Sequence, residues 1–336
     1  MTNLEQLLKS TSRSFYLTLR VLPGPVRPQI GLAYLLARTS DTIADTEIVP
    51  LAQRLQSLKK FRDRLFGHNP TPLNFGDLAQ HQGNPAEKLL LEKVEDTLAA
   101  LQQVSAGDQI LIRAVLDTII GGQELDLKRF SPLADREDPN DQSIIALQTE
   151  QELDDYTYRV AGCVGEFWTR ICRAHLFPDV WVDEEELIAD GIRFGKGLQL
   201  INILRDLPED LKKGRCYLPL EKLQPAKLLP EVLLSPANEF RFLPLYRGYL
   251  DKAEAHLAAG WRYTNALPFS QFRVRLACAW PILIGARTLD RLRIANVLDL
   301  RQNLKISRGE VYRLMLRSLL LSPVPRLWRN LYLPAA

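Results

Sequence analysis

Two stretches of the sequence each carry a pair of aspartates four residues apart. Asp41 and Asp45 lie in ARTSDTIADT, and Asp206 and Asp210 lie in NILRDLPED. Residues four apart share one face of a helix, with their Cβ atoms about 5–6 Å apart. Carboxylate oxygens are hard ligands for Mg²⁺, which usually keeps several waters and shares phosphate oxygens. The spacing therefore predicts two carboxylate pairs suited to Mg²⁺.

Each predicted helix face carries two further polar side chains. These are Tyr34 and Arg38 on the first face, and Gln199 and Asn202 on the second. A polar face is usually solvated, and that alternative stays open for either helix taken alone. The flanking segments GLAYLLAR and GLQLINIL are too apolar for surface helices, so we expect both faces to line a cavity inside a helical bundle. Four carboxylates in one cavity would repel one another and would need a cation.

Arginines accompany both acidic stretches, namely Arg13, Arg38, Arg205 and Arg215. Their planar guanidinium groups match the geometry of phosphate oxygens. Neither face contains His or Cys, which disfavours zinc or iron. Acid and base together favour a site for a diphosphate bridged by metal ions. Pro208 is expected to kink or end the second helix, which would displace Asp210 from the predicted face.

Composition excludes several other classes of protein. The chain has 336 residues, is 46% hydrophobic and carries a formal net charge of only +3, so we expect a sizeable core and no nucleic-acid partner. The four cysteines lack metal-ligand spacing and are expected to be reduced thiols. The N-terminal stretch MTNLEQLLKSTSRSF does not resemble a signal peptide. We therefore expect a cytoplasmic protein.

Helical periodicity dominates, and no alternating pattern is long enough to predict a sheet. We therefore predict an all-α chain forming a single domain over residues 1–336. The predicted helices cover residues 26–45, 50–66, 86–103, 106–129, 149–174, 183–206, 237–264, 271–296 and 308–321. Residues 67–85 and 131–142 are rich in Pro, Gly, Asn and Asp, which predicts exposed loops.

Two apolar stretches near the C-terminus bear on membrane contact. LACAWPILIGA, residues 276–286, is shorter than the roughly 20 residues that span a bilayer and is expected to form a buried helix. Residues 317–336 mix apolar side chains with Trp328 and several arginines. This mix suits a segment lying on anionic lipid, while a helix that packs on the core is an equally good interpretation.

The sequence resembles the squalene/phytoene synthase family of head-to-head prenyl transferases. Five segments in family order carry the resemblance: SRSFYL from 12, YLLARTSDTIAD from 34, YTYRVAGCVG from 156, NILRDLPEDLKKGRCYLP from 202 and LKISRGEVYRLM from 304. The resemblance implies a single isoprenoid-synthase helical bundle with a central active-site cavity. It also implies that Asp41, Asp45, Asp206 and Asp210 bind Mg²⁺ and, through it, the substrate diphosphates.

The family pattern also assigns substrate contacts to residues of this chain. Matched positions with diphosphate or active-site contacts are Ser12, Arg13, Ser14, Phe15, Tyr34, Arg38, Gln199, Asn202, Arg205 and Arg215. Tyr156 matches a tyrosine that squalene synthases use in the first half-reaction, where a phenol could move a proton. Because Tyr156, Cys163 and Phe167 recur at helical spacing, a plain core face is an alternative. Gly162 and Gly165 could admit either a partner helix or a prenyl chain.

Within the family, the resemblance is closest to the squalene synthases. These join two farnesyl diphosphates to presqualene diphosphate and reduce it with NADPH to squalene. DTIAD and LKISRGE resemble their forms of the corresponding segments, so Lys305 and Arg308 are expected to bind NADPH; starting a surface helix is the alternative. Neither a GxGxxG fingerprint nor a phosphate loop is present.

Other interpretations follow from the same resemblance. Dehydrosqualene and phytoene synthases omit the reduction, and a catalytically silent relative would act as an assembly or binding protein. All four motif aspartates are present, which favours an enzyme. We expect a monomer with peripheral membrane contact through its C-terminal segment.

Overall fold

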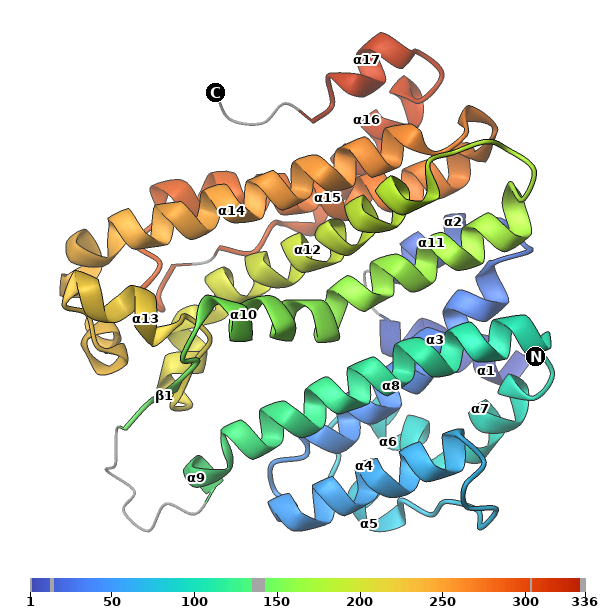
Figure 1. Cartoon of the computed structure of the whole chain (residues 1–336), viewed down its shortest axis with the longest axis horizontal. Helices are drawn as coiled ribbons and strands as arrows, with labels where there is room; N and C mark the ends of the chain where they lie inside the picture. The colour runs from blue at the N-terminus through green and yellow to red at the C-terminus, as the bar shows by residue number, and fades with distance from the viewer. Residues whose placement is uncertain (1, 13–14, 135–142, 303, 333–336) are drawn as a thin grey trace. The chain divides into compact units, whose positions relative to one another are not determined.

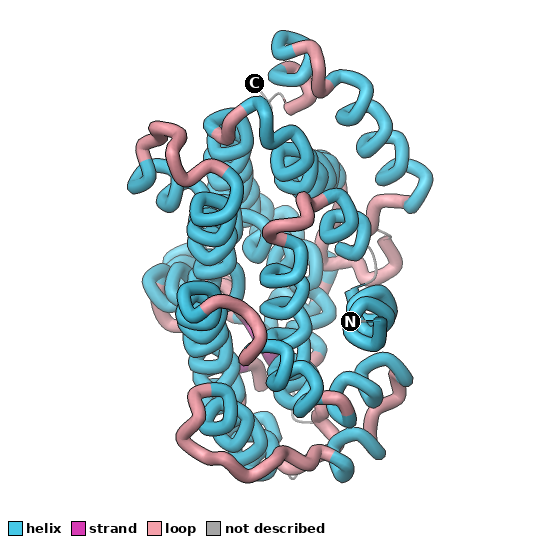
Figure 2. The backbone as a smooth tube through the Cα atoms, turned by 90° about the vertical axis from the view of Figure 1, so that its right-hand side faces the viewer, coloured by secondary structure: helices cyan, strands magenta, loops and turns pink. Residues whose placement is uncertain are grey.

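The computed structural model describes residues 2–12, 15–134, 143–302 and 304–332. Helices dominate these residues (Figures 1 and 2), which confirms the all-α prediction. The chain divides into two compact units. Unit 1 comprises residues 1–134 and 167–179, and unit 2 comprises residues 135–166 and 180–336. The expectations of a single domain and of a central cavity stay predictions.

Unit 1 is built around one acidic-motif helix, α3 (Arg27–Asp45), which packs against α4, α6, α7 and α8. The helices of this unit are α1 (Thr2–Ser12), α2 (Phe15–Val21), α3, α4 (Leu51–Leu65), α5 (Gly76–Gln80), α6 (Pro85–Glu92), α7 (Val94–Leu101), α8 (Ala106–Arg129) and α9 (Ser131–Ala134). Its core contains Leu36, Ile43, Phe61 and Leu116, all fully buried. Burial of this apolar surface is what fixes the orientation of α3.

Unit 2 contains the second acidic-motif helix, α12 (Glu184–Lys212), which packs along α14 and also contacts α15. Its other helices are α10 (Glu150–Thr157), the π-helical turn η1 (Tyr158–Gly162), α13 (Leu220–Leu223), α14 (Glu239–Ala266), α15 (Phe272–Ile294), α16 (Arg308–Leu321) and α17 (Pro325–Arg329), with short 3₁₀ turns between α13 and α15. Helix α11 (Cys163–Leu176) begins in this unit. Figure 1 shows α12, α14 and α15 running side by side.

Local sequence signals explain where several helices begin. Ser105 accepts a hydrogen bond from the backbone N–H of Asp108 and so caps α8. Asp183 caps α12 in the same way. Three glutamates in its first turn interact favourably with the positive end of the helix dipole and so stabilise the start of the helix. Pro28 stands in the first turn of α3, where its missing N–H costs no hydrogen bond.

Most predicted helices have a counterpart in the structure. The differences are interruptions within two predicted helices and short helices that were not predicted. Predicted helix 86–103 is divided at Lys93 into α6 and α7, and predicted helix 149–174 contains the π-helical turn. Helices α1 and α2 were not predicted, and the predicted loop 67–85 contains the short α5. The described residues include two strands of two residues each, which pair in parallel with Ile145 opposite Arg215.

The expectation that Pro208 ends the second motif helix is wrong, because α12 continues through it to Lys212. A proline cannot donate a hydrogen bond to the carbonyl four residues earlier, here that of Leu204. The hydroxyl of Tyr246 on α14 donates to this carbonyl at 3.2 Å. This contact satisfies the carbonyl, and the helix carries Asp210 one turn beyond Asp206.

The glycines near η1 permit close packing of the backbone. A Cβ at Gly165 would overlap the carbonyl oxygen of Gly191, and one at Gly195 would overlap the carbonyl oxygen of Ala161. Both pairs bring the η1–α11 segment directly against α12. Between the alternatives for Gly165, the structure therefore favours helix packing over approach of a prenyl chain.

Candidate metal- and diphosphate-binding residues

The first polar face follows the less buried side of α3. Tyr34, Arg38 and Asp41 are half-buried and Asp45 is exposed, whereas the positions between them, such as Leu36 and Ile43, are buried. The helical spacing thus separates the polar face from the apolar face as expected. Four polar side chains therefore lie on this side of α3.

The carboxylate of Asp41 has both a donor and a repelling neighbour. The side-chain amide of Gln123 on α8 donates to its Oδ1 at 2.5 Å. Burial of the carboxyl, followed by the negative charge of Asp45, raises the pKa of Asp41 to about 6. Its side chain is still 43% exposed, so solvent can deliver an ion to it. Two oxygen donors that disfavour each other's charge fit a divalent cation, which would offset both charges.

Arg38 is oriented by an acid from outside its own helix. Its guanidinium donates to Oε1 of Glu87 on α6 at 2.5 Å and lies 3.8 Å from Asp41. Burial lowers the pKa of Arg38, but its hydrogen bond to Glu87 and the nearby carboxylates raise it by more, so its pKa lies above the ordinary value. The arginine is therefore charged and held beside the Asp41 carboxylate, as binding of a phosphate oxygen would require.

The N-terminal motif is described only in part. Arg13 and Ser14 lie outside the described residues. The hydroxyl of Ser12 is buried and donates to the carbonyl of Leu8 within α1 at 2.5 Å. The rings of Phe15 and Tyr34 lie 5.2 Å apart, and the Tyr34 hydroxyl donates to the carbonyl of Thr11. Tyr34 therefore connects the acidic-motif helix α3 to the end of α1, where the N-terminal motif begins.

The second polar face lies on α12 in unit 2. Gln199, Asn202, Asp206 and Asp210 are half-buried, with Leu200, Leu204 and Leu207 buried among them. The amide of Asn202 donates to that of Gln199 at 3.5 Å. This face thus has the same arrangement as the face on α3.

Arg205 and Asp206 form a charge-assisted pair on α12. Nε and Nη2 of Arg205 donate to the two carboxylate oxygens of Asp206 at 2.8 and 2.5 Å. This hydrogen bond raises the pKa of Arg205 above its ordinary value. A metal ion on Asp206 would have to share this carboxylate with Arg205 or displace it, and the displaced guanidinium would then be available to a phosphate.

Tyr156 and Arg215 lie on adjoining segments of unit 2. The ring of Tyr156 on α10 stacks on that of Tyr217 with centroids 4.6 Å apart. Tyr217 follows the strand β2 (Arg215–Cys216), which holds the half-buried Arg215. Stacking on a buried neighbour orients the Tyr156 ring.

Lys305 and Arg308 are both exposed. Arg308 is the first residue of α16, whose N-cap is Ser307, and the carbonyl of Lys305 accepts a hydrogen bond from Arg291. The nearby carboxylate of Glu310 is paired with Arg291 at 2.6 Å. The exposed side chains of Lys305 and Arg308 carry the charge that suits the phosphates of a dinucleotide. Starting a surface helix is compatible with the same positions.

The described residues contain no cluster of three or more His, Cys, Asp or Glu side chains able to hold a metal ion. The chemistry of the donor set nevertheless fits Mg²⁺, because this ion usually takes one or two carboxylates and completes its coordination with water and phosphate oxygens. The candidate ligands are Asp41 and Asp45 in unit 1, and Asp206 and Asp210 in unit 2.

Two contacting residues, Gln123 and Glu87, were not predicted from the sequence. They approach Asp41 and Arg38 from positions 82 and 49 residues away along the chain. Neither residue stands in a recognisable motif, and only the tertiary packing of α8 and α6 against α3 reveals them.

Comparison with known proteins decides the family. A profile described as squalene/phytoene synthase matches residues 8–310. The chain belongs to this family. The family unites the head-to-head prenyl transferases, and its profile covers both acidic motifs of the chain.

Several relatives within the squalene/phytoene synthase family are similar over most of this chain. A bifunctional lycopene cyclase/phytoene synthase of Phaeosphaeria nodorum is 32% identical over 73% of the chain and 38% of its own length. A presqualene diphosphate synthase of Rhodopseudomonas palustris is 30% identical over 76% of the chain and 75% of its own length. The squalene synthase of Schizosaccharomyces pombe is 25% identical over 95% of the chain and 65% of its own length. The chain thus spans well under half of the first relative.

Solved structures share the fold of this squalene/phytoene synthase family member. The structure of TcSQS in complex with the ligand E5700 superimposes with a TM-score of 0.75 at 21% identity, over 97% of this chain and 91% of that one. A dehydrosqualene synthase in complex with a ligand gives a TM-score of 0.64 at 21% identity, over 96% of both chains. These values support the isoprenoid-synthase helical fold.

Proposed function

We propose that this protein is a squalene synthase that joins two farnesyl diphosphates through presqualene diphosphate and reduces this intermediate with NADPH. The observation that carries the proposal is the pair of acidic helix faces, each with two carboxylates one turn apart and an arginine in contact with an acid of its face. Such an arrangement suits a highly charged diphosphate leaving group. The similarity to squalene and presqualene diphosphate synthases adds support for this branch of the family.

The residues of the chain have distinct roles in this proposal. Mg²⁺, when bound by the four aspartates, would neutralise the diphosphate and favour its departure from the allylic carbon. Arg38 and Arg205 would bind phosphate oxygens, and Gln199 and Asn202 would orient them. When the allylic carbon–oxygen bond breaks, the electron pair leaves with the diphosphate. The stacked Tyr156 is a suitable group to move a proton during the first condensation.

The reduction distinguishes the proposed enzyme from its relatives. Hydride would come from NADPH, whose phosphates Lys305 and Arg308 would bind by charge. The second candidate is a synthase that omits this reduction and releases presqualene diphosphate, dehydrosqualene or phytoene. It is favoured by the similarity to the Rhodopseudomonas presqualene diphosphate synthase over three quarters of both chains.

The product formed with and without NADPH tests the proposal. Purified protein with farnesyl diphosphate and Mg²⁺ is expected to release diphosphate, and added NADPH is expected to convert the product to squalene. Dehydrosqualene or presqualene diphosphate formed in the presence of NADPH, or phytoene formed from geranylgeranyl diphosphate, would select the second candidate. A folded protein that turns over neither substrate would point to the silent relative.

Replacing a motif aspartate tests the assignment of the carboxylates. Asp41→Asn keeps the size of the side chain but removes its charge, so we expect turnover to fall by about a hundred- to a thousandfold, as for loss of a key electrostatic group. Diphosphate release measures this fall, and circular dichroism checks that the helices remain. Asp179→Asn alters an exposed carboxyl outside the motifs and should leave turnover unchanged. Near-normal turnover of Asp41→Asn would refute the assignment.

A further inference from the structure

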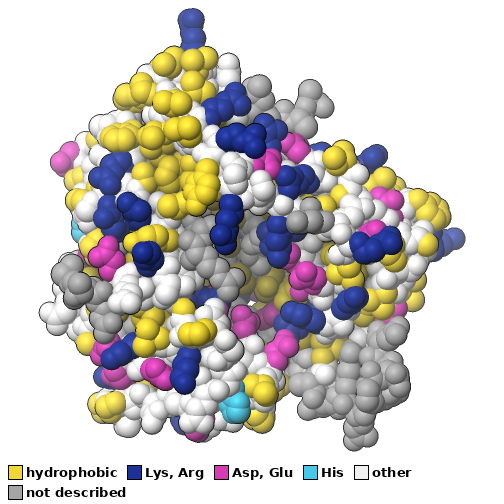
Figure 3. All heavy atoms as spheres, turned by 180° about the vertical axis from the view of Figure 1, so that it is seen from behind, with side chains coloured by type: hydrophobic (Ala, Val, Ile, Leu, Met, Phe, Trp, Pro, Cys, Tyr) yellow, Lys and Arg dark blue, Asp and Glu magenta, His cyan; other side chains and the backbone are white. Residues whose placement is uncertain are grey.

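The C-terminal helices α16 and α17 expose a cluster of large apolar side chains. The cluster, called here the apolar face, consists of Tyr312, Leu316, Leu319, Leu320, Val324 and Leu327, which are 45% to 67% exposed. Hydrophobic side chains gather in this region at the top of the view in Figure 3, with Lys and Arg side chains close by. Clustered apolar side chains on a protein surface usually mark a contact with a membrane or another protein.

The helices that carry the apolar face are attached to the rest of unit 2 by other side chains. Trp328 on α17 is buried, lies 5.3 Å from Trp261 in a stacked arrangement, and donates to the side chain of Asn265 at 3.0 Å. Ser318 on α16 is buried and accepts a hydrogen bond from the indole of Trp280 at 2.9 Å. Because these groups already fix the helices, the exposed leucines are not needed to hold the segment in place.

Positive charge surrounds the apolar face. Residues 308–332 contain five arginines, namely Arg308, Arg313, Arg317, Arg326 and Arg329. The only carboxylate side chain in the same stretch is that of Glu310, which pairs with Arg291. An apolar surface surrounded by arginines matches the composition of segments that lie in the interface of an anionic bilayer. A second protein copy would bring the same positive charge and be repelled.

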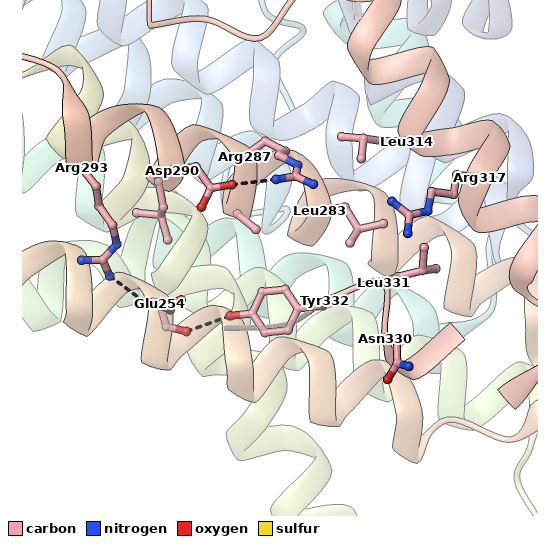
Figure 4. A pocket seen from close by; sticks show the side chains of 12 residues that line it. Glu254, Leu283, Arg287, Asp290, Arg293, Leu314, Arg317, Asn330, Leu331 and Tyr332 are labelled. Carbon is pink, nitrogen blue, oxygen red and sulfur yellow. Dashed lines mark hydrogen bonds and ion pairs between the residues drawn. The ribbon is translucent and has the colours of Figure 1, made fainter. Parts of the chain in front are cut away.

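A cavity of about 310 Å³ lies beside the apolar face, between α14, α15, α16 and residues 330–332. Figure 4 shows Arg287 and Arg317 reaching toward the same space, with Leu283 and Leu314 between them. Arg287 pairs with Asp290 at 2.9 Å. Among the described residues, Arg317 has no carboxylate partner. The cavity is also lined by Glu254, which pairs with Arg293 at 2.6 Å. With both carboxylates paired to arginines, Arg317 offers a guanidinium group to an anion next to an apolar wall.

We infer that the apolar face and this cavity dock the protein on an anionic phospholipid bilayer. The leucines of α16 and α17 enter the interfacial layer, and Arg287 and Arg317 bind headgroup phosphates. No helix in the described part of the chain is long and apolar enough to cross a membrane, so this contact is peripheral. The inference is independent of the proposed catalytic activity.

Flotation with phospholipid vesicles tests the docking surface. The full chain is expected to float with vesicles of equimolar phosphatidylglycerol and phosphatidylcholine, and much less with phosphatidylcholine alone. Leu316→Glu/Leu320→Glu is expected to lower the partition coefficient at least about tenfold by placing charge in the apolar layer. Ile110→Glu/Ile294→Glu introduces the same charge at exposed apolar positions elsewhere and should bind like the wild type.

The arginines are tested separately from the leucines. Arg287→Gln/Arg317→Gln is expected to weaken binding by about fivefold for each charge lost, and added salt should reduce the difference. Arg20→Gln/Arg247→Gln removes two charges from exposed positions outside the cavity and should cost distinctly less.

Two outcomes would overturn the inference. One is equal flotation of the wild type and the leucine variant, or no flotation of either, with both proteins folded by circular dichroism. The other is a dimer in light scattering that the leucine variant converts to monomer, which would show that the face binds a second copy.

Discussion

Asp41 is subject to opposing electrostatic influences within unit 1. Burial and the charge of Asp45 raise its pKa to about 6, whereas Arg38 and the Gln123 amide favour its charged form. Because the folded pKa exceeds the ordinary value of 3.8, ionisation opposes folding as pH rises between these values. A bound cation would remove this opposition. Mg²⁺ should therefore stabilise the fold more above pH 6 than below it.

Gln123 is expected to influence Mg²⁺ binding without contacting the ion. Gln123→Leu removes the donor to Asp41, so the pKa of Asp41 should rise further and Mg²⁺ affinity should fall roughly tenfold, as for other partners of metal ligands. The Mg²⁺ dependence of the unfolding temperature, measured on both sides of pH 6, reports this affinity. Gln151→Leu changes an exposed glutamine on α10 and serves as the matched control. An unchanged Mg²⁺ dependence would show that Gln123 does not position Asp41.

Residue types and spacing predicted the polar faces, but not the contacts that orient them. Tyr34, Arg38 and Asp41 share the expected face of α3, because helical geometry is local. Gln123 and Glu87 reach this face from α8 and α6. Their positions depend on how separate helices pack, and no local pattern encodes that.

At the scale of elements, α12 shows how a hydrogen bond from another helix can allow a helix to continue through a proline. Proline inside a helix usually breaks it, and this rule led to the expected interruption at Pro208. The hydroxyl of Tyr246 satisfies the carbonyl that Pro208 leaves without its helical donor. The second acidic pair therefore depends on α14 for its geometry.

Tyr246→Phe is expected to reveal this dependence. The variant leaves the buried Leu204 carbonyl without its donor and should lower the free energy of unfolding by about 1–3 kcal/mol. Urea denaturation measures the change, and Tyr312→Phe, at an exposed tyrosine on α16, should cost almost nothing. Pro208→Ala restores the helical N–H, so the cost of Tyr246→Phe should shrink in that background. Equal costs in both backgrounds would contradict this account.

The close contact between the η1–α11 segment and α12 leads to a second prediction, which concerns the stability of a variant at Gly165. Gly165→Ala places a methyl group on the Gly191 carbonyl, and backbone cannot move aside as a flexible side chain can. We expect a loss of at least about 3 kcal/mol in unfolding free energy. Gly309→Ala, with no atom within 4 Å of the new methyl group, should lie within about 1 kcal/mol of wild type. Similar stabilities for the two variants would refute the close approach.

The limits of several helices were predicted accurately. Helices α8 and α16 have the predicted limits, and α3 and α15 differ from them by one or two residues. The misses have physical causes. The π-helical turn in Tyr158–Gly162 has the residue composition of an ordinary α-helix, so the sequence does not distinguish it from one. The short helices α1 and α2 gain their stability from packing on other helices, which local sequence does not show.

At the scale of the whole molecule, the proposed reaction requires both acidic pairs even though they belong to different units of the chain. Asp41→Asn/Asp206→Asn should therefore reduce diphosphate release no further than the more severe single variant, since groups that serve one step are not additive. Single-turnover measurements on all three variants test this. Multiplicative losses would show that the two pairs act in separate steps.

The composition and periodicity of the whole chain predicted its fold class, but they did not predict which apolar side chains are exposed. Pervasive helical periodicity was enough to predict an all-α protein. Composition and periodicity could not show that Trp328 packs inward while Leu316 and Leu320 face outward, because both kinds of residue are apolar in a sequence. The C-terminal segment was interpreted either as a segment lying on anionic lipid or as a helix that packs on the core. Only the packing of α17 against α14 shows which side chains face the core and which face outward.

The stacked indoles of Trp261 and Trp328 also give the protein an internal optical signal. Their rings are close enough for their excited states to couple, and both are shielded from water. One belongs to the long helix α14 and the other to the short terminal helix α17. Any event that lifts α17 from the body, whether lipid binding or local unfolding, would break this coupling and shift the emission to longer wavelength while the rest of the helices stay intact.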